Sequence, residues 1–303
     1  MGVKKVDWMK KIAEIQNISV EELKQRLKDQ EEADLEAEIR GQKVALKKPK
    51  EETQLSLPFM GDGIHVVPNS ALRSALFGAI KRGKRKTMFK EKLASSAGVK
   101  IVFTGFRLDQ ADLDVWQRAL HISRESLGQQ IRFTSGSFLK AIGRNASGAS
   151  HEWLKDSLTR LQSAVVEMTD GTKTFSGQLV HNYYIDEITK ECVIELNVKL
   201  SAIFDKDSWT GLDWEQRKAL NGKPLALWLH GFYSTHENPY DYKVETLWRL
   251  CGSEAKELKH FKEQLGEALP LLGEATGWSM RIEDDKLQVF KTPEKLIGRL
   301  AKH

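Results

Sequence analysis

The spacing of apolar side chains separates a thin, highly charged N-terminal part from a globular remainder. Apolar residues recur at helical spacing over residues 4–16, and Ser19 with Glu22 forms a capping-box pattern ahead of a second helix that runs to about residue 40. Because the apolar stripe is thin and charges are dense, we predict a helical appendage over residues 1–52. A linker, residues 53–66, follows it.

From residue 69 onward the pattern becomes that of a globular protein. It predicts a helix over residues 72–80, a strand over 99–104 and a helix over 113–123. Asp109, Asp112 and Asp114 gather at the start of that last helix, where carboxylates cap a helix more often than they bind a cation.

A short helix, a turn and a longer helix come next. We predict the short helix over residues 137–142, the turn at 144–148, and Ser150 as N-cap of the longer helix, which places Leu154, Leu158 and Leu161 on one face. A β-rich stretch follows, with strands expected over 165–169, 173–177, 179–185 and 192–196 and a hairpin turn at 170–171.

The same order returns further along the chain. Helices are predicted over 224–233 and 244–250, and Ser253 is expected to cap a long helix that carries an apolar face from Leu258 to Leu272. Two alternating strands then flank a turn at residues 284–285. Short helix, turn, longer helix and hairpin are typical of a winged helix. We therefore predict an α+β chain with two tandem winged-helix domains, residues 67–197 and 198–303.

In a helix-turn-helix unit the second helix enters the major groove, so its outward face is the candidate reading surface. Lysine and glutamine there suit guanine and adenine, although any exposed helix face is also charged. The outward faces and their flanks, together with a basic cluster downstream of residue 80, supply the expected DNA contacts: Lys81, Arg82, Lys84, Arg85, Lys86, Arg144, Ser150, His151, Lys155, Thr159, Ser253, Lys256, Lys259, His260 and Gln264.

Charge is concentrated rather than spread. The chain has a formal net charge of +5, and residues 1–52 hold 12 basic and 12 acidic side chains, so the excess lies downstream. Residues 81–92 alone carry seven basic side chains against Glu91. Such a cluster favours phosphate backbone, with a solvated loop as the alternative.

Signals for catalysis or metal binding are weak. Residues 78–85 imitate a phosphate-binding loop, but Arg85 stands where Ser or Thr would hold magnesium. His230 and His236 flank Tyr233 without the closely spaced histidine pair of a rolling-circle nicking enzyme, so Tyr233 is expected in the core. We expect no enzyme activity, no cofactor and no metal.

Two distant cysteines and the lack of a long apolar run indicate where the protein works. Cys192 and Cys251 form neither a disulfide framework nor a zinc spacing, which suits a reducing cytoplasm. No apolar run approaches the ~18 residues that a membrane span needs. We expect a soluble, cytoplasmic protein.

Residues 54–59 resemble the hexapeptide with which bacterial replication and repair proteins bind the sliding clamp. Pro58 disfavours helix at Leu57, and charged and glycine-containing flanks indicate an accessible, extended segment in which Leu57 and Phe59 are free to enter an apolar groove. The alternative is a linker that places these side chains on its own domain. The expected clamp contacts are Gln54, Leu55, Leu57, Pro58 and Phe59.

Four long segments, 68–80, 108–116, 158–161 and 222–236, resemble the TrfA-type plasmid replication initiators, and the similarity extends from about residue 54 to 290. The resemblance implies two winged-helix domains that bind directly repeated origin sequences (iterons), help to melt an adjacent AT-rich region and recruit host proteins. It also implies that residues 54–59 bind the sliding clamp and that the protein takes part in plasmid copy number control.

The sequence thus predicts a non-enzymatic DNA-binding initiator. Its expected partners are duplex origin DNA, single-stranded AT-rich DNA, the sliding clamp, and the host initiator and replicative helicase. A monomer–dimer equilibrium and no membrane association are also expected. The competing hypotheses are a winged-helix transcriptional repressor and, with less support, a nicking endonuclease.

Overall fold

The computed structural model describes residues 19–22, 24–25, 28–29, 56–58, 61–96, 98–169, 174–204 and 208–291. The chain divides into two compact units, Met1–Thr53 and Gln54–His303. In the first unit the backbone N–H of Glu22 donates to the Ser19 hydroxyl (3.1 Å), so the predicted cap is confirmed. Most of the predicted N-terminal helices lie outside the described residues.

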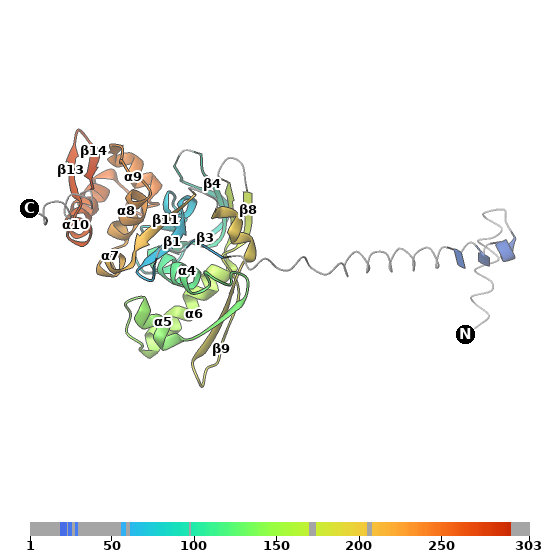
Figure 1. Ribbon diagram of the computed structural model, residues 1–303. Helices are drawn as coiled ribbons and strands as arrows, with labels where there is room; N and C mark the ends of the chain where they lie inside the picture. Colours follow the sequence, from blue (N-terminus) through green and yellow to red (C-terminus); the bar gives the residue numbers. More distant parts are fainter. Residues whose placement is uncertain are drawn as a thin grey trace, which may run out of the picture. The chain divides into compact units, whose positions relative to one another are not determined.

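The second unit contains a helix pair and a three-stranded sheet, one strand of which precedes the pair (Figure 1). In chain order its elements are α4 (Gln110–Ile122), β6 (Gln130–Thr134), α5 (Ser135–Ala141), α6 (Gly148–Ser163), β9 (Val180–Ile185) and β10 (Glu191–Leu196). The strand order is β6-β10-β9, and both pairings are antiparallel. We call α5 and α6 the first helix pair.

The C-terminal elements repeat this arrangement. They are α8 (Pro224–Ser234), β12 (Tyr242–Lys243), α9 (Val244–Leu250), α10 (Leu258–Thr276), β13 (Ser279–Glu283) and β14 (Lys286–Phe290). The strand order is β12-β14-β13, again antiparallel. The strand order therefore recurs, and so does the element order, except that β7 (Val165–Thr169) and β8 (Thr174–Gln178) stand between α6 and β9 in the first half. We call α9 and α10 the second helix pair.

Further strands extend the N-terminal half. Four of them, β3 (Thr87–Leu93), β4 (Lys100–Phe106), β7 (Val165–Thr169) and β8 (Thr174–Gln178), form a sheet in the order β3-β4-β7-β8. The shorter elements are β1 (Ile64–Pro68), α3 (Asn69–Leu72), β2 (Phe77–Gly78), β5 (Leu108–Asp109), η1 (Val198–Ile203), β11 (Trp209–Asp213) and α7 (Trp214–Ala219). β1 pairs with β11, and β2 pairs with β5.

Buried apolar side chains form two clusters that follow these halves. One runs from Leu57 to Trp214 and the other from Leu220 to Val289. Residues 198–214, which the sequence pattern groups with the C-terminal half, contribute Leu200, Leu212 and Trp214 to the first cluster because β11 pairs with β1.

A buried arginine in α7 joins the two halves. The Arg217 side chain is 1% exposed, and its Nε lies 2.5 Å from Oδ1 of Asp114 in α4. The same guanidinium donates to the carbonyl oxygen of Leu227 in α8 (3.3 Å) and to Oε1 of Gln110 (3.0 Å). All three nitrogens of this buried guanidinium donate hydrogen bonds, and these bonds hold the three helices in one arrangement.

Several predicted elements require correction. The helix predicted over residues 72–80 is wrong: α3 ends at Leu72, and β2 at Phe77–Gly78 pairs with β5 instead. The sequence pattern favoured a helix because Leu72, Leu76 and Ile80 are apolar at helical spacing, and all three are buried in the structure. The pairing with a distant strand nevertheless gives this segment an extended backbone. The caps assigned to Ser150 and Ser253 are also wrong, as described below.

The carboxylate cap predicted at the start of α4 is confirmed. Asp109 caps α4: its side chain accepts from the Asp112 N–H (2.9 Å), and the Asp112 side chain accepts in return from the Asp109 N–H (3.1 Å). None of the helices in the described part of the chain is long and apolar enough to cross a membrane.

Candidate nucleic-acid interface

In the first helix pair, the apolar face of α6 lies inward, as predicted. Leu154, Leu158 and Leu161 are fully buried. Its N-cap is Ser147, whose hydroxyl accepts from the Ser150 N–H (3.3 Å), so Ser150 lies inside the first turn and does not cap the helix. On the opposite face Glu152, Asp156 and Thr159 are exposed, so this face mixes acidic and neutral groups.

Lys155, the predicted cationic reader of α6, is held by two carboxylates. Its ammonium nitrogen lies 2.6 Å from Glu187 in the β9–β10 turn and 3.4 Å from Glu152. The hydrogen bond to Glu187 raises the pKa of Lys155, and the same contact lowers the pKa of Glu187. The charge of Lys155 is therefore offset locally in the free protein.

The remaining α6 candidates also contact neighbouring protein groups. His151 Nδ1 lies 3.0 Å from the Ser135 hydroxyl, and the Thr159 hydroxyl lies 2.8 Å from that of Tyr183 in β9. These contacts join α6 to α5 and to the β9–β10 hairpin.

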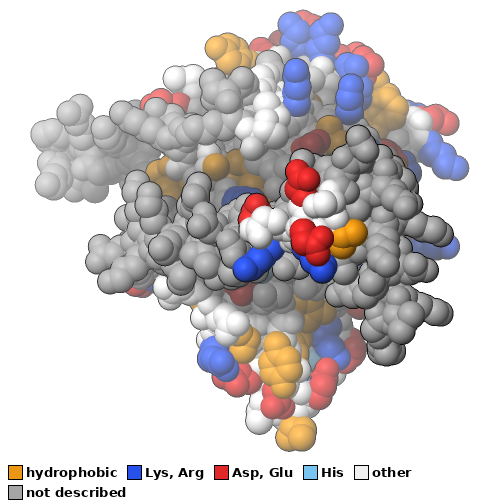
Figure 2. Space-filling view, turned by 90° about the vertical axis from the view of Figure 1, so that its right-hand side faces the viewer, with side chains coloured by type: hydrophobic (Ala, Val, Ile, Leu, Met, Phe, Trp, Pro, Cys, Tyr) orange, Lys and Arg blue, Asp and Glu red, His pale blue; other side chains and the backbone are white. Residues whose placement is uncertain are grey.

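The tip of the β9–β10 hairpin exposes apolar side chains. Tyr184 is 63% exposed and Ile188 is 94% exposed. Figure 2 shows hydrophobic side chains beside charged ones at its lower end, at the height where Figure 1 places β9. The hairpin thus offers an apolar tip next to α6.

The second helix pair is more basic at the start of α10. Lys256, Lys259 and His260 are exposed, and His260 Nδ1 lies 3.2 Å from Glu263 Oε2. α10 begins at Leu258, so the predicted cap at Ser253 is wrong: the Ser253 hydroxyl accepts from the Ala255 N–H (3.2 Å) within the turn.

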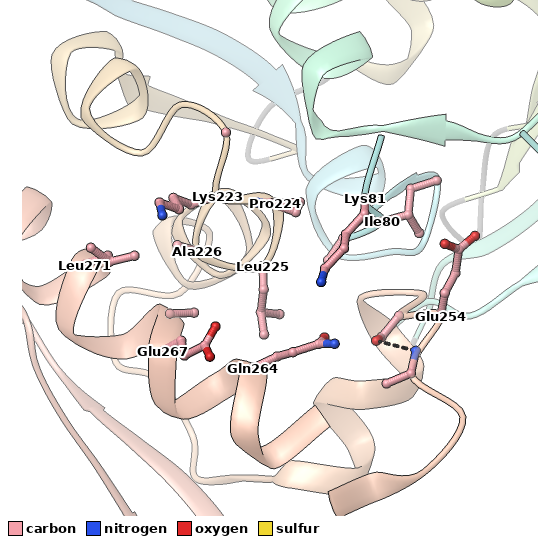
Figure 3. A pocket seen from close by; sticks show the side chains of 15 residues that line it. Ile80, Lys81, Lys223, Pro224, Leu225, Ala226, Glu254, Gln264, Glu267 and Leu271 are labelled. Carbon is pink, nitrogen blue, oxygen red and sulfur yellow. Dashed lines mark hydrogen bonds between the residues drawn. The ribbon is translucent and has the colours of Figure 1, made fainter. Parts of the chain in front are cut away.

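Gln264 does not share the outward face of α10 with Lys259. It is half-buried and lines a hollow together with Ile80 and Leu225, into which Gln264 and Lys81 point from opposite sides (Figure 3). Helical spacing explains the difference. Gln264 lies four residues after His260 and therefore on the same side of α10 as His260, whereas Lys259 faces outward.

The basic cluster, residues 81–86, divides into exposed and buried members. Lys81, Arg82, Lys84 and Lys86 are exposed, and Lys86 pairs with Glu91 (3.0 Å). Arg85 is different: its guanidinium pairs with Asp109, the N-cap of α4, and its side chain is largely buried. Arg85 thus has a structural contact where the sequence suggested a phosphate contact.

Arg144 lies in the turn between α5 and α6. Its guanidinium carbon is 3.5 Å from the centroid of the Trp153 ring, and burial lowers its pKa. Stacking on an aromatic ring holds the guanidinium plane in place between the two helices of the first helix pair.

The segment with the predicted clamp motif is described only at residues 56–58. Leu57 is 5% exposed and belongs to the first apolar cluster, and its backbone N–H donates to the Arg124 carbonyl oxygen (2.6 Å). Ser56 is exposed and Pro58 is half-buried. The expectation that Leu57 is freely accessible is therefore wrong, whereas Gln54, Leu55 and Phe59 lie outside the described residues.

Tyr233 lies in the core, as predicted, and His230 is buried as well. Tyr233 is fully buried, and burial raises the pKa of its hydroxyl. Burial lowers the pKa of His230 to about 3. These side chains do not form an accessible reactive site.

Pattern reasoning missed the residues at the junction of the halves. Arg107 donates to the Gly252 carbonyl in the α9–α10 turn and lies 3.6 Å from Glu254, while Lys223 precedes α8 beside the hollow that Gln264 lines. Isolated cations of this kind give no periodic signal. The sequence cues to these two residues are the strand that precedes Arg107 and the proline, Pro224, that follows Lys223.

Comparison with known proteins identifies the family. A family model described as TrfA protein matches residues 19–289. The plasmid replication initiator protein TrfA of Escherichia coli is 30% identical over 230 residues, which are 72% of this chain and 59% of that protein. The chain thus spans about three fifths of the length of that relative.

These matches place the chain in a family that includes a plasmid replication initiator. It belongs to the TrfA family, as the sequence segments predicted.

Solved structures give a weaker likeness. Domains 2 and 3 of RctB align with a TM-score of 0.49 and 12% identity over 74% of this chain and 96% of that chain. The Pi initiator protein in complex with iteron DNA aligns with a TM-score of 0.48 and 10% identity over 61% of this chain and 94% of that chain. Both scores lie below 0.5, and no property of this chain follows from them.

Proposed function

We propose that this chain is a replication initiator that binds directly repeated origin DNA as a monomer, with two winged-helix domains in one chain. The observation that carries the proposal is the repeated arrangement of helix, strand, helix pair and hairpin, with strand orders β6-β10-β9 and β12-β14-β13. In a winged helix, the strand that precedes the helix pair lies next to the second strand of the hairpin that follows the pair, and both sheets have this order.

The proposed domains follow the two apolar clusters. The first extends from about residue 67 through β11, beyond the limit of 197 suggested by the sequence, because Leu200, Leu212 and Trp214 belong to its apolar cluster. The second begins near Leu220 rather than at 198. Residues 1–52 stay assigned to a separate helical appendage in this proposal.

The DNA site follows from the number of reading helices. One helix in one major groove reads about four to six base pairs, so two domains should protect roughly 17–22 base pairs with contacts about one helical turn apart. Because the two domains are not symmetry mates, the site should be a direct, non-palindromic sequence. Selection of sites from random duplex DNA by the whole chain tests this, and a palindromic consensus would contradict it.

We further propose that residues 54–59 bind the host sliding clamp and that the protein helps to open AT-rich DNA and to recruit the host initiator and helicase. Support comes from family membership and from the motif itself. A clamp pull-down separates an initiator from a repressor, for which a clamp motif has no use. A magnesium-dependent nicking assay separates it from an endonuclease, and we expect no nicking.

A further inference from the structure

Hydrogen bonds connect the loop between β2 and β3 to the turn between α9 and α10 of the second helix pair. The Ala79 N–H donates to the Cys251 carbonyl oxygen (2.8 Å) where the loop begins, and the Arg107 N–H donates to the Lys86 carbonyl oxygen (2.9 Å) where it ends. The Arg107 side chain then donates to the Gly252 carbonyl oxygen. The basic cluster therefore lies at the junction of the two halves.

Two hollows of about 410 and 430 Å³ meet at this loop. Both are lined by Ile80, Lys81, Gly222 and Pro224. One extends to Ser253 and Gln264 of the second helix pair (Figure 3), and the other to Arg144 of the first. The two hollows share these four lining residues, and we call them together the junction trough.

The junction trough carries unbalanced positive charge. Its cations are Lys81, Arg82, Arg144 and Lys223. None of them has a carboxylate in an ion pair among the residues that the structure describes.

Of the carboxylates that line the trough, three are engaged by other arginines. Asp109 pairs with Arg85, Asp114 with Arg217 and Glu254 with Arg107. The fourth, Glu267, is exposed on α10. The cations of the trough are thus left to attract an external anion.

We propose that the junction trough binds the phosphates of the DNA stretch between the segments read by α6 and α10. This inference rests on the proposed function. Two helices in successive major grooves leave a stretch of backbone facing the protein between them, and contacts to that backbone fix register without reading bases. The basic cluster then acts at the centre of the site rather than at its edge.

Cleavage of DNA from a single tethered position tests the location. The two natural cysteines are buried, and burial raises the pKa of each thiol to about 12, so a cysteine introduced on the surface is the reactive one. An iron–EDTA group attached to Lys84→Cys should cut a duplex selected from random DNA in its centre. The same group on Ile188→Cys or Lys286→Cys, at the two hairpins, should cut on either side.

The outcomes separate the inference from the function on which it rests. If no duplex is selected, the proposed function fails. If a duplex is selected and the hairpin variants cut it, then cuts from position 84 at an outer end, or none from that position, overturn the junction trough as a phosphate site. Central cuts support it.

Salt dependence gives a second measurement with a matched control. Arg82→Gln with Lys223→Gln removes two exposed trough cations, and we expect the slope of log K against log salt to fall by about 1.8, or ~0.9 for each contact. Lys92→Gln with Lys100→Gln makes the same charge change on the four-stranded sheet and should leave the slope unchanged. Equal slopes for the two double variants would contradict the proposal.

Discussion

The backbone N–H of Leu57 donates a 2.6 Å hydrogen bond to the carbonyl oxygen of Arg124, just beyond the end of α4. The Leu57 side chain is buried in the first apolar cluster. Leu57 is also the central apolar residue of the proposed clamp-binding motif. The same side chain cannot occupy a groove of the clamp while it packs in its own domain.

The whole chain should therefore bind the clamp more weakly than the free peptide of residues 52–62. Burial of one leucine is worth roughly 1.5–3 kcal/mol, so undocking Leu57 should weaken binding about ten- to a hundredfold. We expect a peptide Kd on the order of 10–100 μM, since ordering a flexible segment offsets much of the contact energy. Fluorescence anisotropy measures both.

A double variant serves as the control. Leu57→Ala with Phe59→Ala should abolish clamp capture. Because Leu57 also packs in the first apolar cluster, the single variant Phe59→Ala is the one that should weaken clamp capture and leave binding to a selected duplex intact. Full clamp affinity in the double variant would rule out the motif. A whole chain that binds as tightly as the peptide would instead show that Leu57 imposes no competition.

Arg85 and Lys84 should differ although they are adjacent cations. Arg85→Met leaves Asp109 buried without its charge partner, and removing one member of a buried ion pair costs roughly 3 kcal/mol of unfolding free energy. Lys84 is exposed, so Lys84→Met should change the free energy of unfolding by less than ~0.5 kcal/mol. Urea denaturation measures both.

DNA binding should show the opposite order for these two variants. Lys84→Met should reduce the salt slope by ~0.9, and Arg85→Met should not. A stable Arg85→Met protein with a reduced slope would return Arg85 to the set of phosphate contacts.

Stability should fall with acid because histidines are buried in their neutral form. The His65 ring stacks between His121 (4.0 Å) and Trp214 (4.2 Å). Burial and the neighbouring His121 lower the pKa of His65 to about 2, and burial lowers the pKa of His121 to about 4. The unfolded chain takes up these protons near pH 6.5, whereas the folded chain does not. The free energy of unfolding is therefore highest above that pH and decreases as the pH falls.

The expected loss is ~1.4 kcal/mol per pH unit for each such histidine between about pH 6 and 4. His65→Phe keeps an aromatic ring in the stack and should remove one histidine's share of that slope. Urea midpoints at pH 7.5, 6.0 and 4.5 measure it. An unchanged pH slope in His65→Phe would show that His65 is protonated in the folded protein.

Segments with a regular apolar period were predictable from the sequence, and pairings between strands distant in the chain were not. α9 and β7 lie where the pattern placed them, because each buries a regular apolar face. β2 and β11 are short strands whose partners are far away in the chain, so no local period marks them. The predicted helix over residues 72–80 failed for this reason.

The candidate site follows the same rule. Helical spacing placed Lys259 outward and Leu265 inward, but it could not reveal that Glu187, on a distant hairpin, neutralises Lys155. Nor could it show that Leu57 packs beside Arg124, since an extended segment carries no periodic information about its partner. Contacts between elements decided which predicted residues remain available.

The two reading helices should contribute unequally to specificity. Lys259 is exposed at the start of α10, whereas Lys155 on α6 is held by Glu187 and Glu152. Lys259→Ala should relax discrimination by ~1–3 kcal/mol within one segment of the site. Lys155→Ala should have a smaller effect in the other segment, because Lys155 must first leave two carboxylates to reach a base.

Glu187→Gln separates these causes. It removes the closer carboxylate from Lys155 without touching α6, so it should strengthen DNA binding and increase the effect of Lys155→Ala when the two are combined. Base-by-base affinity profiles of the single and double variants measure this. If Lys155→Ala and Lys259→Ala lose discrimination at the same base pairs, one helix pair alone reads the site and the model of two reading domains fails.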